Sequence, residues 1–120
     1  MLRFIKSLTY AIRGFNNLLI TQPNFRIHVV LLLLAIVGGF ILDINRFEFL
    51  AVILASGMVL SAEAFNTAIE VLADKVDGTY DERTRILKDI AASAVLLTAI
   101  AALLTGIIVF LPKILHLIFQ

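Results

Sequence analysis

The stretch from Ile90 to Leu111 contains no charged residue and is long enough to cross the hydrocarbon core of a bilayer as a helix. Pro112 is expected to end this run. The chain as a whole is too apolar for an ordinary soluble fold of 120 residues, because 61% of its residues are hydrophobic and its mean hydropathy is +1.02. A lipid bilayer is therefore the expected solvent.

Two further apolar segments precede this run. The first extends from residue 27 to 42 and is interrupted only by His28, and the second begins at Phe47 and continues without a helix breaker into a polar end. Asp77-Gly78 favours a turn before the last run. We predict an all-α membrane protein with a single domain over residues 1–120 and membrane-spanning helices at about 24–42, 47–75 and 86–111.

The first 20 residues show a helical period with an apolar side and a basic, polar side. The polar side carries Arg3, Lys6, Tyr10, Arg13 and Asn17. Charges interrupt this stretch too often for it to span, so we interpret it as an amphipathic helix that lies on the membrane surface. The alternative is an amphipathic helix packed on a soluble partner.

The basic residues indicate the orientation. With three spans, one side of the membrane holds eight of the ten Lys and Arg residues, and the other side holds only Arg46 and Lys113. The positive-inside rule places the richer side, with the N-terminus, in the cytoplasm.

Four polar residues follow one another along the second span, namely Glu63, Asn66, Glu70 and Asp74. At 100° per residue they occupy an arc of roughly 80° on one face of a helix. Acids near membrane depth normally face a protein-lined or watery cavity, so this polar ladder is the leading candidate for a functional site. Such carboxylates can hold Mg²⁺ or accept a proton. The alternative, solvation where the helix leaves the membrane, suits Asp74 better than Glu63.

Lys88 and Asp89 lie at the start of the last span. They form either an interfacial anchor or, if Lys88 faces the ladder, a group that neutralises phosphate oxygens. For His28, a packing or interfacial role is expected. The sequence contains no GxxxxGK[ST] or GxGxxG motif, so a nucleotide would not be bound by a familiar phosphate loop.

The run Glu63-Ala64-Phe65-Asn66-Thr67-Ala68-Ile69-Glu70, followed by Asp74 and by Lys88-Asp89-Ile90-Ala91-Ala92-Ser93-Ala94, resembles the signature of the prokaryotic diacylglycerol kinase and undecaprenol kinase family. The resemblance covers nearly the whole chain. Arg3, Lys6 and Tyr10 match that family's surface helix, and Asn24-Phe25-Arg26-Ile27-His28 matches an N-x-R-I-H stretch that is frequent in its undecaprenol kinase branch.

This resemblance implies a homotrimer of three-span subunits in the bacterial inner (cytoplasmic) membrane, with composite active sites that use MgATP and a lipid alcohol and no nucleic-acid partner. It implies Glu63 as the general base, Asn66 as a residue that places the reacting groups, and Glu70 as a Mg²⁺ ligand. The residues implied at the nucleotide or the lipid are Arg3, Lys6, Tyr10, Asp74, Lys88 and Asp89.

One position departs from the family pattern. Many members carry Glu where this chain has Gln22, and there it joins the second-span Glu in binding metal. A neutral amide supplies a single weaker oxygen, so the number of metal ions stays open.

Three functions remain open on the sequence. The favoured one is a kinase that phosphorylates undecaprenol, and the second is the same kinase acting on diacylglycerol. The third is a non-enzymatic membrane protein whose acids form an ion or proton path. Arg3 and Lys88 disfavour the third, because a cation path has no evident use for them.

Overall fold

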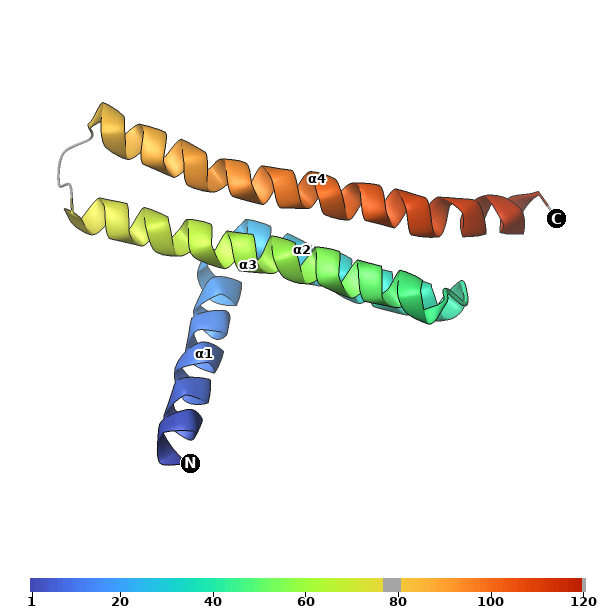
Figure 1. The fold of residues 1–120 in the computed structure, drawn as a ribbon, viewed down its shortest axis with the longest axis horizontal. Coiled ribbons are helices and arrows are strands. Elements are labelled where there is room, and N and C mark those ends of the chain that lie inside the picture. Colours follow the sequence, from blue (N-terminus) through green and yellow to red (C-terminus); the bar gives the residue numbers. More distant parts are fainter. Residues whose placement is uncertain (77–80, 120) are drawn as a thin grey trace.

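The computed structural model describes residues 1–76 and 81–119. Four helices account for nearly all of this part of the chain, and no strand occurs within it. They are α1 (Leu2–Thr21), α2 (Pro23–Ile41), α3 (Arg46–Val76) and α4 (Glu82–Ile118) (Figure 1). The expected all-α fold is confirmed. The turn predicted at Asp77-Gly78 lies outside the described residues.

The three long helices run side by side, with α3 between α2 and α4, and α1 projects from them at a steep angle (Figure 1). Helix α3 packs along both neighbours, whereas α2 and α4 hardly touch each other. The fold is therefore an open arrangement around α3 and not a closed bundle.

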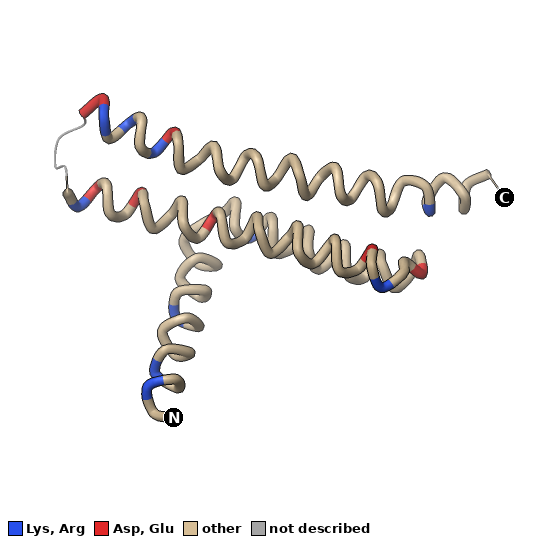
Figure 2. Tube along the Cα trace, viewed as in Figure 1, with Lys and Arg blue, Asp and Glu red and all other residues tan. Residues whose placement is uncertain are grey.

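The distribution of apolar side chains is that of a membrane protein. Large hydrophobic residues are exposed along all three long helices, and few side chains are buried. Helices α2, α3 and α4 are each long and apolar enough to cross a bilayer. Most Lys, Arg, Asp and Glu residues lie on α1 or near the ends of the long helices (Figure 2). The chain is a membrane protein with an amphipathic N-terminal helix and three spans, as the sequence predicts.

The joint between α1 and α2 is fixed by side chains of α2. Pro23 occupies the first turn of α2, where its missing N–H leaves no intrahelical bond unmade. Arg26 donates hydrogen bonds to the carbonyl oxygens of Leu19 and Ile20 at the end of α1, groups that have no partner within that helix. The rings of Phe15 and Phe25 meet edge to face, with centroids 5.3 Å apart. These contacts hold α1 at its angle to the spans.

The turn between α2 and α3 is equally well defined. Asn45 Oδ1 accepts hydrogen bonds from the backbone N–H groups of Phe47 and Glu48, and Glu48 Oε2 accepts one from the N–H of Asn45. This reciprocal arrangement is a capping box and explains why α3 begins here. Gly39 is required on the other side of the turn, because a Cβ there would lie 2.8 Å from side-chain atoms of Ile44 and Phe49.

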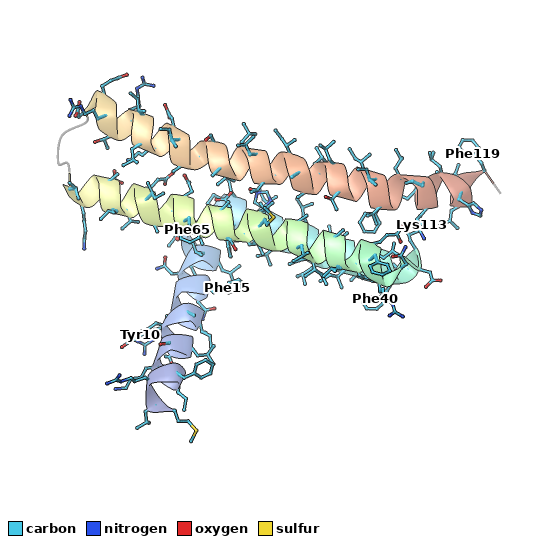
Figure 3. The ribbon with its side chains drawn as sticks, viewed as in Figure 1. Tyr10, Phe15, Phe40, Phe65, Lys113 and Phe119 are labelled. Atoms are coloured by element: carbon cyan, nitrogen blue, oxygen red, sulfur yellow. The ribbon has the colours of Figure 1, made fainter. Side chains whose placement is uncertain are left out.

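The expectation that Pro112 ends the last apolar run as a helix is wrong. Helix α4 continues through Pro112 to Ile118. Proline removes one backbone hydrogen bond, and membrane helices tolerate this loss where neighbouring groups compensate locally. One residue further on, Lys113 points toward the α2–α3 turn (Figure 3), where its Nζ lies 3.6 Å from Glu48 Oε2.

Candidate active site

The polar ladder begins where the surface helix meets the spans. A small cavity is lined by Ala11, Gly14, Phe15 and Leu18 of α1 and by Leu60, Ser61 and Ala64 of α3. Helix α1 therefore lies at the level of Glu63. Since α1 is amphipathic and nearly perpendicular to the spans (Figure 1), this level corresponds to the membrane surface.

Distances along α3 agree with that placement. At 1.5 Å per residue, Glu63 lies about 26 Å from the start of α3 at Arg46, close to the thickness of a hydrocarbon core. Asp74 lies about 16 Å further along, outside the membrane. The ladder thus runs from the edge of the hydrocarbon into water.

Glu63 is buried, with 5% of its surface exposed, and it is the only buried charged residue in the described part of the chain. Its Oε1 atom has no hydrogen-bond partner. His28 of α2 faces it, with Nε2 3.6 Å from Oε1, a distance too long for a hydrogen bond. A buried carboxylate oxygen with no donor is poorly solvated and is available to accept a proton.

Asn66 and Glu70 form the next step of the ladder. Asn66 Nδ2 donates a hydrogen bond of 3.0 Å to Glu70 Oε1, and both residues are half-buried. The amide oxygen of Asn66 is buried and has no hydrogen-bond partner. Two neighbouring oxygen-bearing side chains, one with an unused oxygen, suit a hard divalent cation. Residues 1–76 and 81–119 contain no group of three or more His, Cys, Asp or Glu that could hold a metal on their own.

The polar ends of α3 and α4 are joined by an ion pair between Asp74 and Lys88. Next along α4, Arg85 bonds to Asp89 and Glu82. The structure thus brings the Lys88-Asp89 pair beside the end of the ladder, on the side where a nucleotide would approach from water.

Four of the predicted site residues lie apart from this cluster. Arg3, Lys6 and Tyr10 are exposed on α1, and Figure 3 shows Tyr10 on the part of α1 that projects away from α3 and α4. Gln22 lies in the α1–α2 joint, where its amide donates to Thr21 Oγ1. Within a single chain, these four residues make no described contact with Glu63, Glu70 or Lys88.

The position of His28 beside Glu63 does not follow from the sequence pattern. His28 also lies at the polar end of an apolar groove of about 640 Å³ between α2 and α4, over α3. Its other walls are mainly aliphatic and include Leu32, Ala35, Val59, Leu103 and Phe110. The groove therefore approaches the buried carboxylate from inside the membrane.

Comparisons with known proteins show which proteins this chain resembles. A family model described as prokaryotic diacylglycerol kinase matches residues 9–110. The chain is 32% identical over 111 residues to an undecaprenol kinase of Bacillus subtilis, an alignment that covers 92% of this chain and 90% of the relative. It is 38% identical over 112 residues to a diacylglycerol kinase of Synechocystis, covering 92% of this chain and 64% of that protein. A diacylglycerol kinase of Escherichia coli is 32% identical over 103 residues, covering 86% of this chain and 84% of the relative.

Proposed function

This chain belongs to the prokaryotic diacylglycerol kinase family and is a lipid kinase, and we propose that it transfers the γ-phosphate of ATP to the hydroxyl group of undecaprenol, with Glu63 as the general base. The observation that carries the assignment of the base is the burial of Glu63 at the membrane surface with one carboxylate oxygen unpartnered. A lipid hydroxyl reaches that depth without leaving the bilayer.

The reaction needs few groups. The acceptor hydroxyl oxygen forms a bond to the γ-phosphorus, the bond from that phosphorus to the β,γ-bridging oxygen breaks, and ADP departs with the electron pair. The proton of the hydroxyl passes to the carboxylate of Glu63. Positioning and charge neutralisation dominate catalysis of this kind, which suits a small site made of helix side chains.

The groups that neutralise phosphate charge lie on the water side of Glu63. Lys88 is the principal cation there, Asp89 supports the nucleotide site, and Asp74 holds Lys88 on the α3 side. Arg3, Lys6 and Tyr10 complete the site if three chains assemble and the surface helix of one closes over another. A homotrimer of composite sites is therefore part of the proposal, and the separation of Arg3, Lys6 and Tyr10 from the ladder within one chain (Figure 1) supports it.

A divalent cation is expected with ATP in this family, and we assign it as Mg²⁺ held by Glu70 with the help of the Asn66 amide oxygen. When bound, it would neutralise the charge of the phosphate oxygens. Gln22 would be a weaker further ligand, because its amide is neutral. The Asn66 Oδ1 atom, which has no hydrogen-bond partner in the described part of the chain, is free to serve as the ligand beside Glu70.

Undecaprenol is the preferred acceptor on two observations. The chain carries Asn24-Phe25-Arg26-Ile27-His28 at the start of α2, and its alignment with the Bacillus undecaprenol kinase covers nearly all of both proteins. The higher identity to the Synechocystis diacylglycerol kinase favours diacylglycerol as the second candidate. An ion or proton path has no support from the family match.

The site faces the cytoplasm in this proposal, because ATP is there and because the ladder end carries most of the basic residues. The membrane is then the bacterial inner membrane, with the N-terminus inside.

The test is a phosphorylation assay with γ-labelled ATP in mixed micelles, presenting undecaprenol and diacylglycerol separately at equal mole fraction. We expect labelled undecaprenyl phosphate to form with the higher kcat/KM, and the Glu63→Gln variant to form little product with either lipid. Higher kcat/KM for diacylglycerol would reassign the acceptor. No labelled product with either lipid would reject the proposed reaction.

A further inference from the structure

The contact between His28 and Glu63 joins two helices at the one buried charge in the described part of the chain. His28 lies five residues after Pro23, near the start of α2, and Glu63 lies past the middle of α3. The Nε2 atom of His28 lies 3.6 Å from Oε1 of Glu63, an oxygen that has no hydrogen-bond partner among the described residues. The two residues are 35 positions apart, so packing of α2 on α3 creates this contact.

Neighbouring residues of α2 fix the direction in which the His28 side chain points. Phe25 and Arg26, within the same turn, fix α2 against α1 through the Phe15 ring and the two carbonyl groups at the end of α1. Phe25 is almost completely buried, so the start of α2 has little freedom to rotate. The contacts between α1 and α2 therefore hold the His28 imidazole beside Glu63.

The carboxylate needs such a partner. An anionic oxygen in a buried position is strongly destabilised unless a donor or an opposite charge faces it. Without one, the Glu63 side chain would be expected to turn toward water and the other ladder residues, away from the hydroxyl of a membrane lipid. A shift of about 1 Å in a reacting group lowers the rate by up to about 100-fold.

We propose that His28 is a positioning residue for the reaction: its Nε2 atom holds the Glu63 carboxylate at the edge of the hydrocarbon, in the orientation that accepts the proton of the lipid hydroxyl. This inference rests on the proposed function and assigns a role to a residue outside the polar ladder. A slight closure of the 3.6 Å gap makes the contact a hydrogen bond, with imidazole N–H donating to one lone pair of Oε1. The other lone pairs of the carboxylate stay available for the proton of the lipid hydroxyl. Tightening of such contacts in the substrate complex is common in enzymes.

A competing role must be separated from this one. His28 also lines the apolar groove between α2 and α4, so it could serve only as a wall of that groove. A wall residue affects how well a lipid is held, and therefore the KM for lipid. A residue that orients the base affects kcat at saturating lipid and ATP.

The experiment compares four purified proteins in the labelled-ATP assay, with kcat and both KM values measured for each. They are the wild type, His28→Leu, His28→Gln and Leu33→Ala. His28→Leu removes the N–H donor and keeps an apolar side chain in the membrane, whereas His28→Gln places an amide N–H where Nε2 lies. Leu33→Ala alters an exposed residue of α2 that lines neither the groove nor the ladder, and it is the control for disturbing the helix.

We expect His28→Leu to lower kcat by about 10- to 100-fold with the KM for ATP unchanged, and His28→Gln to recover at least a third of the wild-type kcat. Leu33→Ala should turn over at the wild-type rate. We expect both His28 variants to unfold in detergent at the same midpoint temperature as the wild type. A lower midpoint would identify a variant whose kcat falls because less of the enzyme is folded.

Three results would overturn the proposal: a wild-type kcat in His28→Leu, a change confined to the KM for lipid, or a His28→Gln variant as slow as His28→Leu. Including Glu63→Gln in the same series distinguishes a failure of the His28 inference from a failure of the proposed function. If Glu63→Gln is inactive while His28→Leu is fully active, the inference about His28 fails and the proposed function stands. If Glu63→Gln is fully active, the assignment of the base fails as well.

Discussion

The ammonium group of Lys88 on α4 pairs with the carboxylate of Asp74 on α3, across the water-facing ends of two helices. Asp74 is well exposed, and an ion pair of this kind contributes at most about 1 kcal/mol to stability. The same lysine is the cation that our proposal places against the phosphates. Its structural and catalytic roles are therefore separable by substitution.

Reversing the pair tests this separation. The double variant Asp74→Lys, Lys88→Asp restores an ion pair between the two helices but puts the cation on the wrong helix. We expect its thermal midpoint to stay within a few degrees of the wild type and its kcat to fall by at least about 100-fold, because the loss of a group that neutralises phosphate charge has this order of effect. Activity near that of the wild type would show that Lys88 serves only to join the helices.

Replacing Glu63 with Gln keeps its size and removes its ability to accept a proton. We expect kcat to fall by roughly two to four orders of magnitude while ATP binding is retained. Steady-state rates with labelled ATP, together with equilibrium binding of a nucleotide analogue, measure the two effects. Near-normal turnover would eliminate Glu63 as the base.

Replacing Glu70 should change how the reaction rate depends on the Mg²⁺ concentration. Glu70→Gln removes the charged oxygen that accepts the Asn66 hydrogen bond, so the Mg²⁺ concentration for half-maximal rate should rise, or activity should be lost at every Mg²⁺ concentration. The measurement is a Mg²⁺ titration at saturating ATP. A titration curve that matches the wild type would exclude Glu70 from the metal site.

At Gln22 a substitution can add a metal ligand, whereas the substitution at Glu70 removes one. If it lies near the metal in the assembled protein, Gln22→Glu adds a charged ligand and should lower the Mg²⁺ concentration for half-maximal rate, while Gln22→Ala should change it little. In the single chain its side-chain amide donates to the hydroxyl of Thr21. Equal Mg²⁺ midpoints in the wild type and both variants would remove Gln22 from the metal site.

The orientation can be read with a membrane-impermeant thiol reagent, because the chain has no cysteine of its own. Asn45→Cys, in the α2–α3 turn, should react in intact cells, and Asp81→Cys, at the start of α4, should react only after lysis. The loss of the Asn45 cap costs about 1 kcal/mol and does not change which side the turn faces. Labelling of Asp81→Cys alone in intact cells would reverse the proposed topology.

The sequence pattern predicts the helical fold well because long apolar runs and polar breaks leave little choice of structure in a bilayer. The prediction that a helix ends at Pro112 fails, since the effect of a proline depends on the surroundings of α4 and not on proline alone. The polar ladder is predictable for a similar reason: residues of one helix at helical spacing share a face whatever lies around them.

The contact of His28 with Glu63 could not be predicted in this way. After His28, helix α2 is apolar on every side, so its sequence carries no signal for which side faces α3. The rotation of α2 is set instead by the packing of Phe25 and by the bonds of Arg26 to α1. The proposed roles of Arg3, Lys6 and Tyr10 depend on contacts between chains, and neither the sequence pattern nor the structure of one chain contains such contacts.

Helix α3 lies next to both α2 and α4, and this arrangement bears on how the protein is made. Because α2 packs on α1 and α3 and hardly on α4, its principal neighbours have all been synthesised before the last helix leaves the ribosome. The turn sealed by Asn45 and Glu48 allows α2 and α3 to enter the bilayer together as a hairpin. We therefore expect α4 to dock on an α2–α3 pair that is already in place.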